Sequence, residues 1–170
     1  MHCVMHWVNG EIKMNEHANL IGEKFPYFSL KDSSGESFSQ DSLLDVWSVI
    51  SFFPKGGSPR FTIESCTLRD KQAEIEALGA QVIAISTDSM THHRRFKKKY
   101  AIEYKLLCDI QGRLSKKLNL KRILEVMRGR VTFVVDPKCF IRGVITTDLL
   151  MHAKSAIRLL VEFMADESSS

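Results

Sequence analysis

Short apolar runs alternate with longer amphipathic segments through the central part of the chain. Residues 46–53 (VWSVISFF) form an apolar run that ends at Pro54, and residues 81–86 (QVIAIS) form a second one. Short runs rich in β-branched and aromatic residues predict buried strands. A further short strand is expected at 105–108.

Four segments have the pattern of helices. Residues 62–78 are followed by Gly79, a residue typical of the position just past a helix C-terminus. Residues 89–100 follow Asp88 and Ser89, either of which is a suitable N-cap. A short helix is expected at 112–118. Residues 153–164 carry apolar side chains at i, i+3, i+4, i+7, i+8 and i+11, which predicts an amphipathic helix.

Two β-rich runs near the C-terminus are joined by a tight turn. Residues 131–135 and 140–146 flank 136–139, in which Pro137 holds the second position and favours a reversal, hence an antiparallel hairpin. Together the elements predict an α/β protein with a central mixed β-sheet flanked by helices. Their order is that of the thioredoxin fold.

Composition supports one globular domain. The chain has 170 residues, of which 44% are hydrophobic and 26% charged, values that are ordinary for a globular protein. We expect a tail at 1–20, a domain at 21–165 and a polar tail at 166–170. No apolar run approaches the roughly 18–20 residues of a membrane span, and the N-terminus does not have the pattern of a secretory signal. These features favour a cytoplasmic protein without a membrane partner.

The net charge of +4 is mild, and its densest part is residues 92–99. A nucleic-acid surface is one interpretation. However, Met90, His93, Phe96 and Tyr100 recur at helical spacing, which favours the exposed side of an amphipathic helix and no nucleic-acid partner. The adjacent His92 and His93 diverge by about 100° on a helix, so we predict no metal site there. We also predict no cofactor.

The segment 54–62 joins a buried strand to the start of a helix. The first turn of a helix has free backbone N–H groups and the positive end of the helix dipole. Such a place can bind an anion or stabilise a thiolate with a low pKa. The residue at the helix start, however, is Phe61, which offers no nucleophile, acid or base.

Several segments resemble the peroxiredoxins, in particular the AhpC/TSA-like branch named after bacterioferritin comigratory protein. Residues 21–30 (IGEKFPYFSL) are similar to the family opening "VGDKAPDFTL", and 52–66 (FFPKGGSPRFTIESC) resemble "YFYPKDDTPGCTKEAC". The match continues through 69–70, 79–80, 86–89, 109–112 and 130–137. This resemblance covers most of the chain and implies the thioredoxin-like fold.

The resemblance also implies a mechanism. In the family a cysteine at the helix start attacks a peroxide as thiolate and becomes a sulfenic acid, which a second thiol resolves as a disulfide that thioredoxin or another thiol reductant reduces. By position, Pro54 matches the shielding proline, Ser58 the threonine, Arg130 the positioning arginine and Cys66 the resolving cysteine. Phe61 stands where the attacking cysteine would be.

Three departures lie together in this loop: Ser58 for threonine, Arg60 for glycine and Phe61 for cysteine. Serine keeps the hydroxyl group, but Phe61 removes the reaction. Cys66 lies five residues further on, about 7.5 Å along the helix and roughly 140° around it, so it gains little from the helix terminus. Cys66 is equally well interpreted as a small buried helix residue.

Other assignments also have plain alternatives. Arg130 could be a surface arginine, although the motif on both sides favours an inward, pocket-facing role, and Ser58 could be a turn or capping residue. Cys108 is most simply a strand residue and Cys139 a turn residue. Two functions remain open: a degenerate peroxiredoxin that acts as a binding or regulatory module, and a thiol peroxidase with residual chemistry at Cys66. Whether the chain is an enzyme therefore stays undecided from the sequence.

Overall fold

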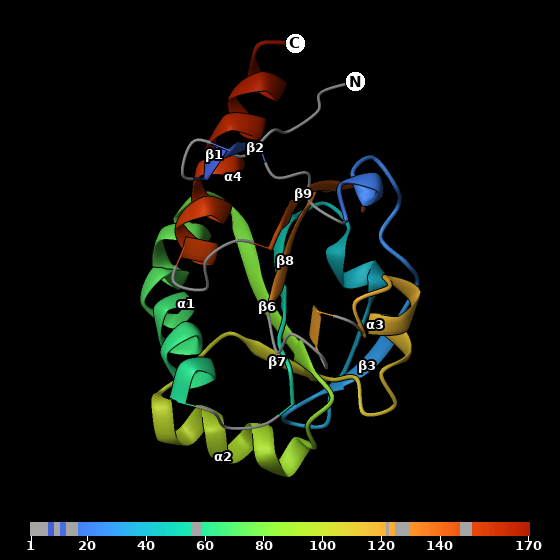
Figure 1. The fold of residues 1–170 in the computed structure, drawn as a ribbon, viewed down its shortest axis with the longest axis vertical. Coiled ribbons are helices and arrows are strands. Elements are labelled where there is room, and N and C mark those ends of the chain that lie inside the picture. Colours follow the sequence, from blue (N-terminus) through green and yellow to red (C-terminus); the bar gives the residue numbers. More distant parts are fainter. Residues whose placement is uncertain are drawn as a thin grey trace.

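A seven-stranded mixed sheet forms the centre of the molecule (Figure 1). The computed structural model describes residues 7–8, 11–12, 17–55, 59–121, 123–124, 130–146 and 151–170. The strands lie in the order β4-β3-β7-β6-β5-β8-β9. Their bounds are β3 Ser29–Asp32, β4 Ser37–Ser39, β5 Trp47–Phe52, β6 Ala80–Ser86, β7 Lys105–Cys108, β8 Val131–Val135 and β9 Ile141–Ile145.

The central strands are almost entirely buried because both faces of the sheet are covered. Strands β5, β6 and β7 are parallel, and β8 and β9 form the predicted antiparallel hairpin. Along β5, Ile50 and Phe52 pack into one core, and Val49 packs into the other. Alternating side chains of a strand point to opposite faces, so a strand buried on both sides has no polar face to display.

Helices cover the two faces unequally. Helix α1 (Pro59–Ala77) and helix α4 (His152–Ser168) lie together on one side, and the short α3 (Arg113–Lys117) lies on the other (Figure 1). Helix α2 (Met90–Tyr100) lies across the end of the molecule in this view. None of the helices described is both long enough and apolar enough to cross a membrane.

The predicted mixed sheet and all four helices are present, with shifted ends. Helix α1 begins at Pro59 rather than at 62. Proline is common at the first helical position, because the N–H group there makes no hydrogen bond within the helix and its absence costs nothing. Helix α4 continues to Ser168, so three residues assigned to the polar tail form its last turn. The sequence did not predict β3 and β4, nor the short pair β1 (Trp7–Val8) and β2 (Glu11–Ile12) inside the segment assigned to the N-terminal tail.

The basic segment is the exposed side of α2, as the helical spacing predicted. His93 and Phe96 are buried, whereas Arg94, Arg95, Lys98 and Lys99 are exposed. The Ser89 side chain caps the helix by accepting a hydrogen bond from the His92 backbone N–H at 3.2 Å. Beneath the helix, the His93 ring contacts Ser86 Oγ through Nε2 at 2.8 Å.

Burial of His93 predicts that acid destabilises the fold. Burial lowers the pKa of His93 to about 4 from 6.5, with His92 and Lys97 adding to the decrease and Asp88 opposing it. The neutral imidazole therefore stabilises the protein fully above about pH 6.5, and this contribution falls as the pH drops toward 4. Its total is about 3 kcal/mol.

Urea unfolding at pH 7 and pH 4.5 measures this loss. The His93→Asn variant is expected to be less stable at pH 7 but to lose less free energy of unfolding on acidification, because asparagine does not titrate. An equal loss in the native protein and the variant would show that His93 is not the responsible group.

Candidate functional site

An aromatic cluster occupies the start of helix α1. Phe61, the third residue of the helix, is 4% exposed. Its ring lies 4.5 Å from the ring of Phe53 and 5.0 Å from that of Phe96, measured between centroids. Contacts of this kind fill the space with apolar surface and exclude water. Where the sequence placed candidate thiol chemistry, the structure places a packed hydrophobic side chain.

Arg130 lies inside the protein and not on the surface, and the pocket-facing role that its surrounding motif predicts stays a prediction. Its Nε lies 3.5 Å from Glu64 Oε2, and its Nη2 donates to Ser65 Oγ at 3.3 Å. The guanidinium carbon also lies 5.5 Å from the centre of the Phe53 ring. Burial lowers the pKa of Arg130, while Tyr104 and Glu64 act in the opposite direction. The ion pair therefore joins β8 to α1 through the core.

Tyr104 holds the same part of α1 from another direction. Its hydroxyl group donates to the backbone carbonyl of Ser65 at 2.9 Å. Burial raises the pKa of Tyr104 to about 12, against the opposing effects of Arg130 and of the bond to Ser65, so the hydroxyl keeps its proton at neutral pH. The second turn of α1 is thus fixed by two long side chains that come from outside the helix.

Cys66 lies on the edge of the buried stripe of α1. It is half-buried and free, and the fully buried positions on either side of it are Ser65 and Leu68. Five residues separate it from Phe61, so the two side chains point in directions about 140° apart on the helix. Ser58 lies outside the described residues. Cys108 ends β7, and Cys139 lies in the β8–β9 turn with a left-handed φ of 68°, both as predicted.

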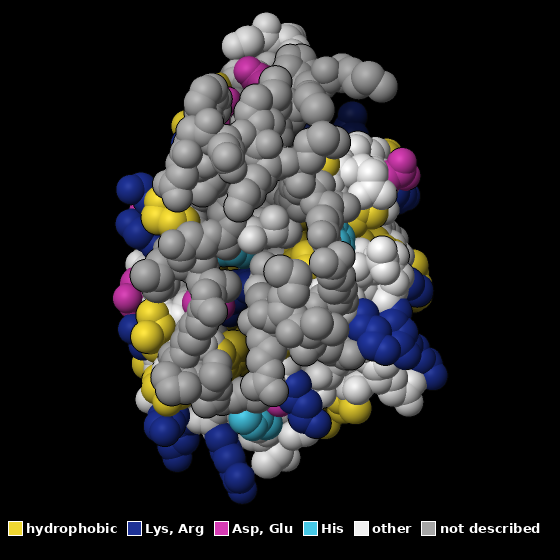
Figure 2. Space-filling view, in the orientation of Figure 1, with side chains coloured by type: hydrophobic (Ala, Val, Ile, Leu, Met, Phe, Trp, Pro, Cys, Tyr) yellow, Lys and Arg dark blue, Asp and Glu magenta, His cyan; other side chains and the backbone are white. Residues whose placement is uncertain are grey.

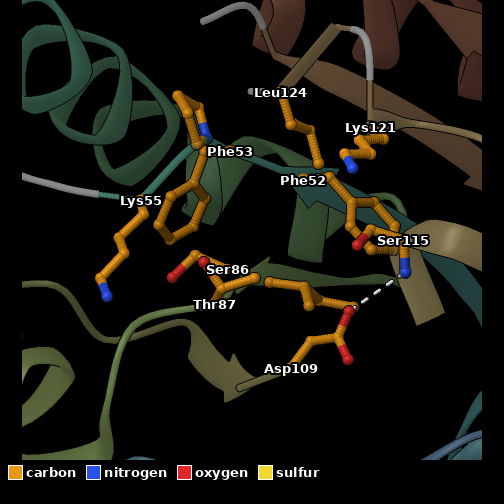
Figure 3. A pocket seen from close by; sticks show the side chains of 11 residues that line it. Phe52, Phe53, Lys55, Ser86, Thr87, Asp109, Ser115, Lys121 and Leu124 are labelled. Atoms are coloured by element: carbon orange, nitrogen blue, oxygen red, sulfur yellow. Dashed lines mark hydrogen bonds between the residues drawn. The ribbon is translucent and has the colours of Figure 1, made fainter. Parts of the chain in front are cut away.

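A cavity of about 360 Å³ opens where the parallel strands end (Figure 3). The apolar part of its wall comes from Phe52, Phe53, Pro54, Ile85 and Leu124. The polar part comes from Lys55, Ser86, Thr87, Asp109, Ser115 and Lys121. In Figure 3 the two lysine side chains approach from opposite sides. The carboxyl ends of parallel strands are a common place for ligands in α/β proteins.

The groups around this cavity can bind but offer no thiol. Asp109 is engaged by helix α3, because its carboxylate accepts the backbone N–H groups of Leu114 at 3.3 Å and Ser115 at 3.0 Å. No cysteine is among the described residues that line the cavity. The two lysines favour an anionic ligand. Of the predicted site residues, Pro54 lines this cavity, while Phe61 and Arg130 share contacts with the Phe53 ring beside it.

Sequence analysis missed the partners of these residues. Glu64, Phe53 and Tyr104 were not singled out, although they hold Arg130, Phe61 and α1 in place. One signal was present: Glu64 follows Phe61 by three residues, a spacing that puts both side chains on one face of the helix. No local signal could have paired Tyr104 with Ser65, which lies 39 residues away.

The fold and the sequence motifs define a thioredoxin-like α/β protein. The sequence profile of the AhpC/TSA family matches residues 21–144, well over half of the chain. The chain therefore belongs to the AhpC/TSA family, and the predicted fold is confirmed.

Individual relatives are peroxiredoxins. A Coxiella burnetii protein named as a peroxiredoxin of the bcp type is 32% identical over 73% of this chain and 86% of its own length. The chloroplastic peroxiredoxin Q of Populus jackii is 31% identical over 69% of this chain, which spans about half (55%) of that protein. The crystal structure of peroxidoxin BcpB from Mycobacterium tuberculosis has a TM-score of 0.76 and 29% identity, covering 84% of this chain and 96% of the other.

The buried ion pair predicts a large cost for removing its carboxylate. Glu64→Gln keeps the shape of the side chain but leaves the Arg130 cation without its counter-charge, so we expect a loss of roughly 3–5 kcal/mol in the free energy of unfolding. Urea denaturation, monitored by circular dichroism, measures this loss in the free energy of unfolding.

Glu74→Gln is the matched control, because Glu74 is exposed and pairs with Lys71 at 3.1 Å on the outside of the same helix. Breaking an exposed pair should cost less than about 1 kcal/mol. If both substitutions lowered the free energy of unfolding by the same amount, the buried ion pair would not stabilise the protein more than the exposed one.

Proposed function

We propose that this chain is a degenerate peroxiredoxin, in which Phe61 takes the place of the attacking cysteine and peroxidase turnover is weak or lost. Members of the family act on peroxides with the help of thiol reductants. On this proposal the chain keeps the family scaffold and serves as a binding or regulatory module. Its ancestral substrate is a peroxide, and its location in the cytoplasm stays a prediction.

The observation that carries the proposal is the packing of Phe61. Its ring is almost fully buried between Phe53 and Phe96, so position 61 presents an aromatic ring packed against its neighbours and no nucleophile. Covalent catalysis requires an activated nucleophile, and a benzyl side chain cannot supply one.

Several residues that match the family motif around position 61 are still present, which argues against loss of the whole site. Arg130 keeps a carboxylate partner in the core, and Pro54 lines a cavity with cationic side chains at its walls. Ser58 keeps the hydroxyl group of the family threonine in sequence. These residues are the machinery that a restored cysteine would use, and the lysine-lined cavity is the place where a bound anion would lie.

The alternative function is a thiol peroxidase or redox protein with residual chemistry at Cys66, using thioredoxin or another thiol reductant. Its support is that Cys66 is free and half-buried, so a reagent could reach the thiol. Two features weigh against it. Cys66 is remote from the helix N-terminus, where the dipole would favour a thiolate, and the buried contacts of Arg130 go to its neighbours Glu64 and Ser65.

Hydrogen peroxide consumption by the reduced protein tests the two functions, with thioredoxin and its reductase as the electron source. We expect the native protein to be no faster than its Cys66→Ser variant. The Phe61→Cys variant should exceed the native rate by at least about tenfold, because it restores a nucleophile at the helix start.

Phe61→Ser is the matched control for this experiment. It creates the same space as cysteine without a thiol, so it should stay at the native rate. Peroxide turnover by the native protein that Cys66→Ser abolishes would overturn the proposal and establish the alternative.

A further inference from the structure

A second thiol, Cys108, has a histidine ring in contact with it. The Sγ atom of Cys108, at the end of β7, lies 3.2 Å from Nδ1 of the buried His93. The other ring nitrogen of His93 lies 2.8 Å from Ser86 Oγ, and Ser86 Oγ donates to Asp88 Oδ2 at 3.0 Å. Four side chains from β6, β7, α2 and the turn before α2 thus form one continuous chain of hydrogen bonds.

The direction of these hydrogen bonds determines which nitrogen of the His93 ring carries the proton. The only proton of the Ser86 hydroxyl points to Asp88, so Ser86 Oγ accepts from His93 and Nε2 carries the hydrogen. Nδ1 then presents its lone pair to Cys108, whose S–H donates to it. A nucleophile, a base in contact with it and a third group that orients the base are the parts of an activated nucleophile.

Both members of the pair are neutral at rest. Burial raises the pKa of Cys108 to about 11, and burial lowers the pKa of His93 to about 4. The thiol therefore keeps its proton until an electrophile arrives, and the proton passes to Nδ1 as the sulfur attacks. General-base catalysis needs the base within hydrogen-bond reach of the proton, which this contact provides, and it is most efficient when the pKa values are well matched. The gap between these two pKa values therefore makes Cys108 slower to react than a matched thiol and base would be.

Cys108 also lines a second cavity, of about 570 Å³, a size typical of small-molecule sites. Its walls contain the aromatic and aliphatic side chains Tyr27, Phe28, Leu30, Met90, Ile110 and Leu114. Tyr27 is 63% exposed and Ile110 is 62% exposed, although both are large apolar residues. The cavity can therefore hold an apolar or aromatic group against a wall to which Cys108 contributes.

The charged walls of this cavity favour an anion. Lys31, Arg113 and Lys117 contribute three positive charges and Asp109 contributes one negative charge, which leaves a formal +2. The Asp109 carboxylate already accepts two backbone N–H groups of α3. Figure 2 shows Lys and Arg side chains gathered on the side of the molecule where α3 lies. Such a field raises the local concentration of anions.

We propose that Cys108 and His93 form a thiol-exchange site whose cavity takes a small anionic disulfide with an apolar or aromatic body. The Cys108 sulfur attacks one sulfur of the disulfide while its proton moves to His93 Nδ1. A new S–S bond forms, the S–S bond of the ligand breaks, and the leaving thiolate takes the proton from His93. Cys108 ends as a mixed disulfide, and one thiol is released.

This inference does not depend on the proposed function, because neither Phe61 nor Cys66 takes part. Its experiment leaves Phe61 unchanged, so a failure here says nothing about peroxide turnover. Conversely, loss of peroxidase activity leaves the exchange site untouched.

The test uses the protein with Cys3→Ser, Cys66→Ser and Cys139→Ser, so that Cys108 is the one remaining thiol. Two probes are compared: dithiobis-nitrobenzoate, an aromatic disulfide with two carboxylates, and cystamine, a disulfide with two ammonium groups. For each probe, the rate constant of the protein thiol is divided by the rate constant of mercaptoethanol, a neutral free thiol, with the same probe. The normalised rate should be at least about tenfold higher for the anionic probe, with one mixed disulfide per chain in the intact mass.

Variants separate the base from the cationic wall. His93→Asn should slow both probes by about tenfold or more, since it removes the proton acceptor. Arg113→Gln should reduce the preference for the anionic probe and leave the cystamine rate unchanged or higher. Arg158→Gln, an exposed change on α4, is the matched control and should alter neither rate.

Two results would overturn the proposal. One is equal normalised rates for the two probes. The other is a Cys108 rate no higher than that of Cys139 in the protein where Cys139 is the one remaining thiol, because Cys139 is also buried but its sulfur faces the backbone carbonyl of Gln40. The Arg113→Gln comparison still decides the matter if His93→Asn fails to fold, since Arg113 is exposed.

Discussion

The ion pair between Arg130 and Glu64 fixes how helix α1 lies on the sheet. The two side chains are 1% and 4% exposed, and a buried cation is tolerated only where an opposite charge meets it. Because Arg130 precedes β8 and Glu64 lies in α1, the pair sets the position of the helix start. Ser65 and Tyr104 add hydrogen bonds at the same turn. Phe61 is thereby held against Phe53 in the core.

The two cavities differ in chemistry although both lie near the ends of the parallel strands. The smaller one has Pro54 and two lysines but no cysteine among its described lining residues. The larger one has Cys108 and three cationic side chains. Ser86 connects them, since it lines the first cavity and orients His93 behind the thiol of the second. The cationic cavity at Pro54 and the thiol at Cys108 therefore lie in different parts of the described fold.

Much of the fold could be predicted from the sequence because apolar runs and helical spacing report burial directly. Strand β5, the cap at Ser89 and the hairpin at Pro137 are local signals of this kind. Strands β3 and β4, the latter at the edge of the sheet, were missed because both are short and have few buried residues. At the site, Phe61 and Arg130 were singled out through motifs, and their roles, like those of Pro54, Ser58 and Cys66, stay predictions. The pairing of Cys108 with His93 was missed because a pattern shows which residues are buried, not which buried groups meet.

The most direct test of the central claim is the second-order rate constant for oxidation of the protein thiols by hydrogen peroxide. It is measured by rapid quenching and intact mass on a Cys108→Ser variant, which removes the second thiol site and leaves Phe61 in place. Without a nucleophile at the start of α1, the rate constant should be no higher than that of free cysteine at the same pH. A much higher rate constant would mean that another thiol is activated for peroxide attack, and would contradict the account of Phe61 as the residue that ended catalysis.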